Sequence, residues 1–247
     1  MKLSVLGSGS SGNGYILQNE DEALIIECGM PLNNALSKLD NNLRKVVGCL
    51  VTHSHGDHAK YISQYIQPFY IYATEGTFRE KNIQDTFHRY IVSYNHQFKV
   101  GNFTILPFRT IHDTEEPCGF LIQHKEIGNL IFATDTRKML YKFNELHLNH
   151  ILIECNHAPA MVSQNVINGV LPKCVGQRIV DNHMNIERCI DFIRSSCLDN
   201  VQEIILLHLS QNNSNPAAFK KQIQEVSGKA VFVAQKDLEV DLSLGIV

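Results

Sequence analysis

The sequence of 247 residues lacks several features that would define a protein class at once. No apolar run approaches the roughly 20 residues that a membrane-spanning helix needs, and no export signal is recognisable at the start of the chain. The seven cysteines are scattered and never form a C-x-x-C pair, so neither a disulfide framework nor a zinc ribbon is indicated. These absences predict a soluble, unexported protein of the cytoplasm, without a membrane partner.

The chain also lacks an excess of basic charge. Its formal net charge is −3, so any binding of nucleic acid has to use a local basic patch. No Pro/Ser/Gly-rich linker, low-complexity tract or internal repeat interrupts the sequence, and its 44% of hydrophobic residues can build a substantial core. We therefore expect a single folded domain over residues 1–247, whose oligomeric state the sequence leaves open.

Apolar patterns predict an α/β protein in which strands outnumber helices. Strands are expected at residues 2–6, 15–18, 23–27, 46–52, 69–73, 103–108, 119–124, 130–133, 151–154, 204–208 and 230–233. Helices are expected at residues 31–39, 59–66, 185–197 and 216–226.

A glycine-rich stretch, VLGSGSSGNGY, follows the first strand pattern. Gly7, Gly9 and Gly12 fall on the G-x-G-x-x-G spacing of dinucleotide sites, and Glu27 lies near the distance of a ribose-binding carboxylate. The segment after Gly12 leaves no room for the crossover helix that such a site requires, however. A turn between two antiparallel strands is the favoured interpretation, and a dinucleotide site remains the alternative.

The chemistry concentrates in the sequence THSHGDH, directly after a buried-looking strand pattern. His53, His55, Asp57 and His58 are four potential metal ligands within six residues, and Gly56 permits a sharp turn between them. This pattern suits two neighbouring metal ions better than a solvated histidine-rich loop. Two close metals need more ligands than one loop supplies.

Further ligand types stand where later apolar strand patterns stop. His112 follows FTILPFRT, Asp135 closes NLIFATD, and His208 closes EIILLH. Each has an ordinary explanation as a capping or turn residue. Their combination with the THSHGDH loop favours a shared metal site.

Together, the THSHGDH loop and these three downstream residues resemble the metallo-β-lactamase superfamily over essentially the whole chain. The resemblance implies an α/β fold, a four-layer αββα sandwich, with a dinuclear metal site along one edge of the sheets. It implies that one ion is held by His53, His55 and His112, the other by Asp57, His58 and His208, and that Asp135 bridges both. Zinc is the expected metal, with manganese and iron as alternatives, and no organic cofactor is expected.

Within the superfamily, the segments GSGSSGN, TDTR, IECNH and HLSQNNSNP resemble the YycJ/WalJ-like branch. This resemblance implies a metal-dependent exonuclease or phosphodiesterase acting on DNA or RNA. The chain has His183-Met184-Asn185 where the branch pattern has His-Leu-Ser, which leaves the exact substrate open. Asn185 can still cap the following helix.

Two close divalent ions can lower the pKa of a shared water and neutralise phosphoryl oxygens, which suits phosphodiester hydrolysis. The residues expected to serve catalysis are Asp57, Asp135 and His183. His183 is the expected proton donor or phosphate contact, with a surface-loop histidine as the alternative. The candidates for a local basic rim are Lys60, Arg79, Lys81, Arg137 and Lys138, with solvated helix faces as the ordinary alternative. A small-molecule hydrolase, cleaving a cyclic phosphodiester, lactone or thioester, and a metal-binding module without turnover remain as other function classes.

Overall fold

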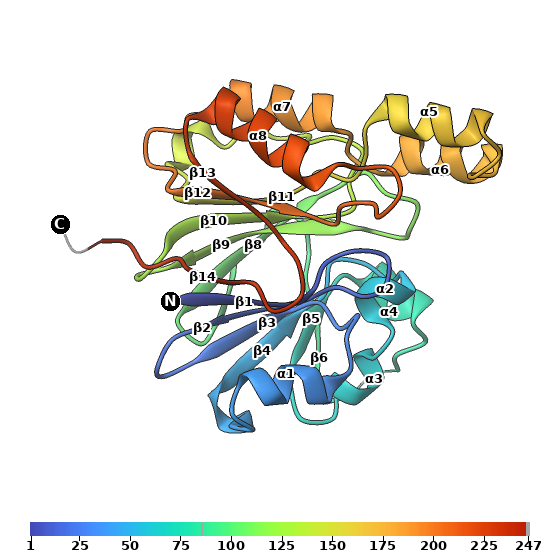
Figure 1. Ribbon diagram of the computed structural model, residues 1–247. Helices are drawn as coiled ribbons and strands as arrows, with labels where there is room; N and C mark the ends of the chain where they lie inside the picture. The colour runs from blue at the N-terminus through green and yellow to red at the C-terminus, as the bar shows by residue number, and fades with distance from the viewer. Residues whose placement is uncertain (85, 246–247) are drawn as a thin grey trace. The chain divides into compact units, whose positions relative to one another are not determined.

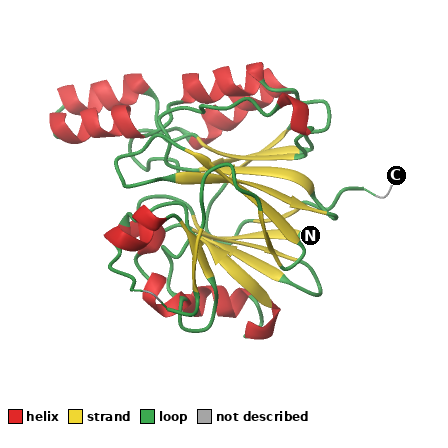
Figure 2. Cartoon of the chain, turned by 180° about the vertical axis from the view of Figure 1, so that it is seen from behind, coloured by secondary structure: helices red, strands yellow, loops and turns green. Residues whose placement is uncertain are grey.

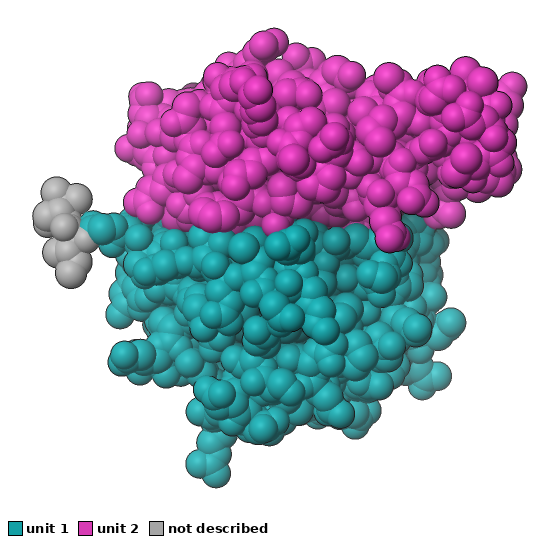
Figure 3. All heavy atoms as spheres, in the orientation of Figure 1, with its two compact units in different colours: residues 1–109, 114–128, 234–247 teal, residues 110–113, 129–233 magenta. Residues whose placement is uncertain are grey.

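The computed structural model describes residues 1–84 and 86–245. By its internal contacts the chain divides into two compact units, coloured separately in Figure 3. Unit 1 comprises Met1–Arg109, Thr114–Gly128 and the segment from Ala234 to the end of the described residues, and unit 2 comprises Thr110–Asp113 and Asn129–Val233. The single domain over residues 1–247 stays a prediction, and its residues 85, 246 and 247 lie outside the described part.

Unit 1 contains a seven-stranded sheet of order β14-β1-β2-β3-β4-β5-β6. Its strands are β1 (Lys2–Gly7), β2 (Gly14–Gln18), β3 (Ala23–Ile26), β4 (Val46–Leu50), β5 (Ile71–Ala73), β6 (Arg89–Ile91) and β14 (Glu239–Asp241). β1, β2 and β3 pair antiparallel, whereas β3 to β6 pair in parallel. The antiparallel β1–β2 hairpin confirms the glycine-rich turn and rules out the strand–helix context of a dinucleotide site.

Unit 1 also contains three antiparallel strands, β7 (Phe98–Val100), β8 (Phe103–Arg109) and β9 (Cys118–His124). Its helices are α1 (Leu32–Lys38), α2 (Gly56–Ala59), α3 (Ile62–Tyr65) and α4 (Glu75–Glu80), with a short 3₁₀ turn at Leu43–Lys45. Apolar side chains of α1, α3 and α4 pack with those of β3 and β4 in one buried cluster. Removal of this apolar surface from water is the main stabilising contribution.

The expected helix at residues 59–66 is wrong, because the structure has the two short helices α2 and α3 instead. The physical reason is a pair of tertiary hydrogen bonds at the break. The Tyr61 amide donates to the Cys28 carbonyl at 2.9 Å, and the His58 carbonyl accepts from the Cys28 amide at 2.7 Å. Both groups are thereby withdrawn from a continuous helical ladder.

Unit 2 is built on a parallel sheet of order β13-β12-β11-β10. Its strands are β10 (Gly128–Ala133, of which Gly128 belongs to unit 1), β11 (His150–Glu154), β12 (Glu203–Leu207) and β13 (Ala230–Val233). A 3₁₀ turn at Asn144–Leu146 precedes β11. The strands β11 and β12 are buried along their whole length, which is why their sequences read as continuous apolar runs.

The helices of unit 2 are α5 (Pro159–Ile167), α6 (Lys173–Asn182), α7 (Ile186–Ser195) and α8 (Pro216–Ser227). α7 and α8 pack side by side, with α8 against β13 (Figure 1), and within each unit the helices gather on one face of its strands (Figure 2). Asn185 caps α7 by accepting from the Arg188 amide at 2.8 Å, as expected from the sequence.

Sequence patterns do not predict six elements: the helices α4, α5 and α6 and the short strands β6, β7 and β14. α5 buries only Val162 and α6 buries only Gly176, so neither helix presents a buried apolar stripe of several residues. Each of the three strands has only three residues, which is too short for an alternating pattern to be recognised. No helix among the described residues combines the length and the apolar character needed to cross a bilayer.

Candidate metal-binding and catalytic site

Four of the predicted ligands lie together in unit 1, on the loop that follows β4 and enters α2. The imidazole centroid of His53 lies 4.2 Å from that of His58 and 5.0 Å from that of His55. Asp57 Oδ2 lies 3.5 Å from His58 Nε2. The rings of His53 and His58 are buried, whereas His55 and Asp57 are partly exposed. One short loop therefore gathers four metal-ligand side chains, as its sequence predicts.

The glycine-rich turn supports this loop through Asn13. The Asn13 amide donates to the Asp57 carbonyl at 2.7 Å, and its side-chain Nδ2 lies 2.9 Å from His58 Nε2. Gly29 also packs against this backbone, because a Cβ at that position would lie 1.7 Å from the Asp57 carbonyl oxygen. The turn that resembles a nucleotide cradle in sequence thus holds the histidine loop in place.

Glu27, the residue of the dinucleotide alternative, also belongs to this loop's surroundings. Its buried carboxylate accepts a hydrogen bond from the Thr52 hydroxyl and lies 3.3 Å from His58 Nδ1. A carboxylate on the second ring nitrogen orients a metal-binding histidine and fixes its tautomer. Glu27 holds a left-handed φ of 72°, which is uncommon outside glycine and frequent at functional sites.

The other three predicted ligands lie together in unit 2. Asp135 Oδ2 is 3.5 Å from His112 Nε2, and Asp135 Oδ1 is 3.4 Å from His208 Nδ1. Asp135 follows β10 and His208 follows β12, so the parallel strands deliver both residues to the same edge of the sheet. Both have positive φ, 43° for Asp135 and 52° for His208. At both residues the backbone therefore leaves the extended conformation of the preceding strand for the left-handed region.

His183 joins this cluster through Glu154, a residue that sequence patterns do not place at the site. Glu154 ends β11, and its Oε1 accepts from His183 Nδ1 at 2.6 Å. The ring of His183 stacks on that of His208, with centroids 5.4 Å apart and planes inclined by 15°. Ligand atoms of Asp135, Glu154, His183 and His208 all lie within 4.8 Å of one another. The only indication of Glu154 in the sequence is its position as a carboxylate at the end of the apolar run HILIE.

The electrostatics of this cluster couple Glu154 to His183. Burial raises the pKa of Glu154, but the charge of His183 and the hydrogen bonds from His183 and His208 outweigh it and leave the pKa below its ordinary value. Burial lowers the pKa of His183, but the charge and hydrogen bond of Glu154 and the charge of Asp135 raise it above the ordinary value. Burial dominates at His112, whose pKa is lowered.

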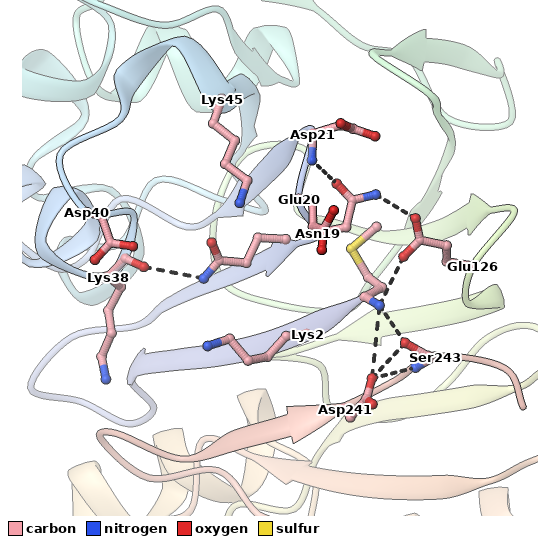
Figure 4. A pocket seen from close by; sticks show the side chains of 12 residues that line it. Lys2, Asn19, Glu20, Asp21, Lys38, Asp40, Lys45, Glu126, Asp241 and Ser243 are labelled. Carbon is pink, nitrogen blue, oxygen red and sulfur yellow. Dashed lines mark hydrogen bonds and ion pairs between the residues drawn. The ribbon is translucent and has the colours of Figure 1, made fainter.

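A polar cavity of about 730 Å³ lies elsewhere in unit 1 (Figure 4). The Met1 amine in its wall donates to Ser243 Oγ at 2.6 Å and lies 3.0 Å from Glu126 Oε2. None of the residues predicted to bind metal or to act in catalysis lines this cavity. The size of this cavity is therefore no argument that the catalytic site lies there.

The sequence is similar to proteins named as nucleases. A family model described as anti-Pycsar protein Apyc1 matches residues 1–72. The chain is 27% identical to the exodeoxyribonuclease YycJ of Bacillus anthracis, over 97% of this chain and 94% of that protein. It is 23% identical to the exodeoxyribonuclease WalJ of Streptococcus pneumoniae, over 86% of this chain and 83% of that protein.

The structure is similar to that of the metallo-β-lactamase fold protein YhfI from Bacillus subtilis. The TM-score is 0.73 at 19% sequence identity, over 97% of this chain and 98% of that one. The chain therefore has the metallo-β-lactamase fold, and the predicted α/β sandwich class is confirmed. The resemblance to the YycJ/WalJ-like branch of this superfamily is confirmed as well.

Proposed function

We propose that this protein is a metal-dependent hydrolase that cleaves phosphodiester bonds in DNA or RNA, as an exonuclease. The observation that carries the proposal is the cluster of the buried Asp135, Glu154 and His208 with the half-buried His183 at the edge of the parallel sheet. The names of the similar YycJ and WalJ proteins support the nuclease class.

The chemistry of the donors fits divalent metal ions. Asp135 and Glu154 are two buried carboxylates with oxygens within 4.8 Å of each other, and a cation relieves their mutual repulsion. Imidazole and carboxylate are the ligands of zinc, and they also serve manganese and iron. We propose two ions, with zinc as the first expectation. The ligands would be those that the family resemblance implies: His53, His55, Asp57, His58, His112, Asp135 and His208.

When bound, such ions supply an activated water and neutralise charge on the phosphoryl oxygens. The protein's own contribution is to orient the donors. Glu27 faces the second nitrogen of His58, and Glu154 fixes the ring of His183. Asp135 has its two oxygens directed to different histidines, which suits the bridging role that the resemblance implies.

His183 is the proposed proton donor to the leaving oxygen. Its Nδ1 is engaged by Glu154, so Nε2 is the ring atom at which a proton can be held for the substrate. The side chain is 18% exposed, enough to be reached from solvent. Loss of this proton donor affects a poor leaving group far more than a good one.

The substrate class is tested with the full chain reconstituted with Zn²⁺ and, separately, with Mn²⁺. Single- and double-stranded DNA, RNA, a cyclic nucleotide and a thioester are offered in parallel. Cleavage of DNA or RNA that stops on chelation is expected. Turnover of the cyclic nucleotide or thioester alone would replace the proposal with a small-molecule hydrolase, and bound metal without any turnover would indicate a binding module.

The role of His183 is tested with His183→Ala on two diesters, one with an ordinary alkoxide leaving group and one with 4-nitrophenolate. On the first, kcat is expected to fall by a factor on the order of 10² to 10⁴, and on the second it should change little. Equal losses on both substrates would indicate phosphate positioning instead. Wild-type rates on both would leave His183 without a catalytic role.

A further inference from the structure

A second cavity, of about 290 Å³, lies in unit 2, and none of the residues of the candidate site lines it. One wall is the segment after β10 and the other is α7. The lining includes Lys138, Leu140, Tyr141, Lys142, Arg188 and Phe192. Two apolar or aromatic surfaces and three cationic side chains therefore share one cavity.

The apolar part of the cavity is suited to a flat ring. Of its lining residues, Phe192 is buried, Leu140 is 46% exposed, and Tyr141 is partly exposed. The ring of Tyr141 lies 6.4 Å from that of the buried Phe143. A partly exposed aromatic ring can stack with any nucleobase, because every base offers a π face.

The polar part of the cavity is positive in a chain whose net charge is −3. Lys138, Lys142 and Arg188 line it, with Asp191 as the single acidic residue of the lining. Over the described ranges of the chain, no ion pair joins any of these three cations to a carboxylate. Unpaired cations around an apolar cavity are complementary to a phosphate attached to a base.

Glu154 ties both walls of the cavity to the candidate site. Its Oε2 accepts from the Thr136 amide at 2.8 Å and from the Met184 amide at 3.0 Å. The Thr136 hydroxyl in turn donates to the Lys138 carbonyl at 2.9 Å. The two walls thus continue from the segments that carry Asp135 and His183.

Arg188 links the two walls of the cavity by a hydrogen bond. Its Nη1 donates to the Arg137 carbonyl at 3.3 Å, so a hydrogen bond joins α7 to the segment after β10. An occupant of the cavity would therefore lie between two segments that continue along the chain from Asp135 and from His183.

We propose that this cavity is a nucleotide subsite, which binds one nucleotide of a single-stranded substrate adjacent to the bond that is cleaved. The base lies against Tyr141 and Leu140, and the neighbouring phosphate is held by Lys138, Lys142 and Arg188. The inference rests on the proposed nuclease function and specifies how that function selects nucleic acid over other phosphodiesters.

The test compares wild type with Tyr141→Ala on two substrates of the metal-reconstituted full chain. A labelled single-stranded oligonucleotide, as DNA and as RNA, reaches the subsite, whereas bis(4-nitrophenyl) phosphate is too small to need it. For the oligonucleotide we expect KM to rise about tenfold, the loss typical of one stacked base. Turnover of the small diester should be unchanged, which also shows that the variant folds, and Tyr141→Phe should restore the wild-type KM.

The phosphate contact is tested by Lys142→Ala, with the exposed Lys236→Ala as matched control. Each phosphate contact that is lost should reduce the slope of log affinity against log salt by about 0.7 for a single strand. The aromatic control is Tyr90→Ala, which removes a ring that is 47% exposed in unit 1. Both controls should behave as wild type.

The outcomes separate the subsite from the nuclease function. If wild type cleaves the oligonucleotide and Tyr141→Ala does so with an unchanged KM, the subsite is refuted and the nuclease function stands. If wild type cleaves only the small diester, the nuclease proposal itself fails. Equal losses in Tyr141→Ala and Tyr90→Ala would also refute the subsite.

Discussion

His157 provides a sharp test of the electrostatics in unit 2. It follows β11, its carbonyl accepts from the Ile186 amide at 3.0 Å, and its side chain is fully buried. Neither ring nitrogen has a hydrogen-bond partner within the described part of the chain. Burial lowers its pKa from 6.5 to about 4, and the attraction of Glu154 offsets only part of this effect.

The sign and size of the consequence follow from proton linkage. Between pH about 4 and 6.5 the unfolded chain binds a proton at His157 that the folded chain does not bind. The free energy of unfolding therefore has its full value above pH 6.5 and falls as the pH drops toward 4. The fall amounts to about 1.4 kcal/mol per pH unit and about 3 kcal/mol over the window.

Urea-induced unfolding at a series of pH values from about 8 to 4 measures this effect, with a chelator present so that metal release adds no pH dependence of its own. His157→Phe fills a similar volume without an ionisable group, so the difference between wild type and variant isolates this histidine. The control His96→Gln removes a histidine at the surface and should keep the wild-type profile. Parallel profiles for wild type and His157→Phe would refute the reasoning.

Two further predictions concern the metals and their support. Elemental analysis after reconstitution should find close to two metal ions per chain, and Asp135→Ala should lose both metal and activity; at most traces of metal in wild type would contradict the ligand assignment. Glu154→Gln should keep the fold but lower kcat by about 10- to 100-fold, because the amide is a poorer partner for His183 Nδ1 than the carboxylate. Unchanged kcat in steady-state assays of Glu154→Gln would show that this contact does not orient a working residue.

The sequence alone predicts those features that depend on residues close together in the chain. The THSHGDH loop gathers His53, His55, Asp57 and His58 within six residues, so the position of the strand before it and the turn at Gly56 already bring them together. The fully buried strands β11 and β12 were also predictable, since burial on both faces leaves an unbroken apolar run.

Only the tertiary structure shows the features that depend on contacts between residues distant in the sequence. Glu154 and Glu27 each end an apolar strand pattern, and sequence alone gives no reason to connect Glu154 with His183 or Glu27 with His58. The break between α2 and α3 depends on hydrogen bonds with Cys28, some thirty residues earlier, which no local pattern contains. Neighbouring residues alone predict the metal-ligand side chains and the buried strands. The carboxylates that orient the histidines depend on contacts between strand ends that are distant in the sequence, and only the folded chain brings these together.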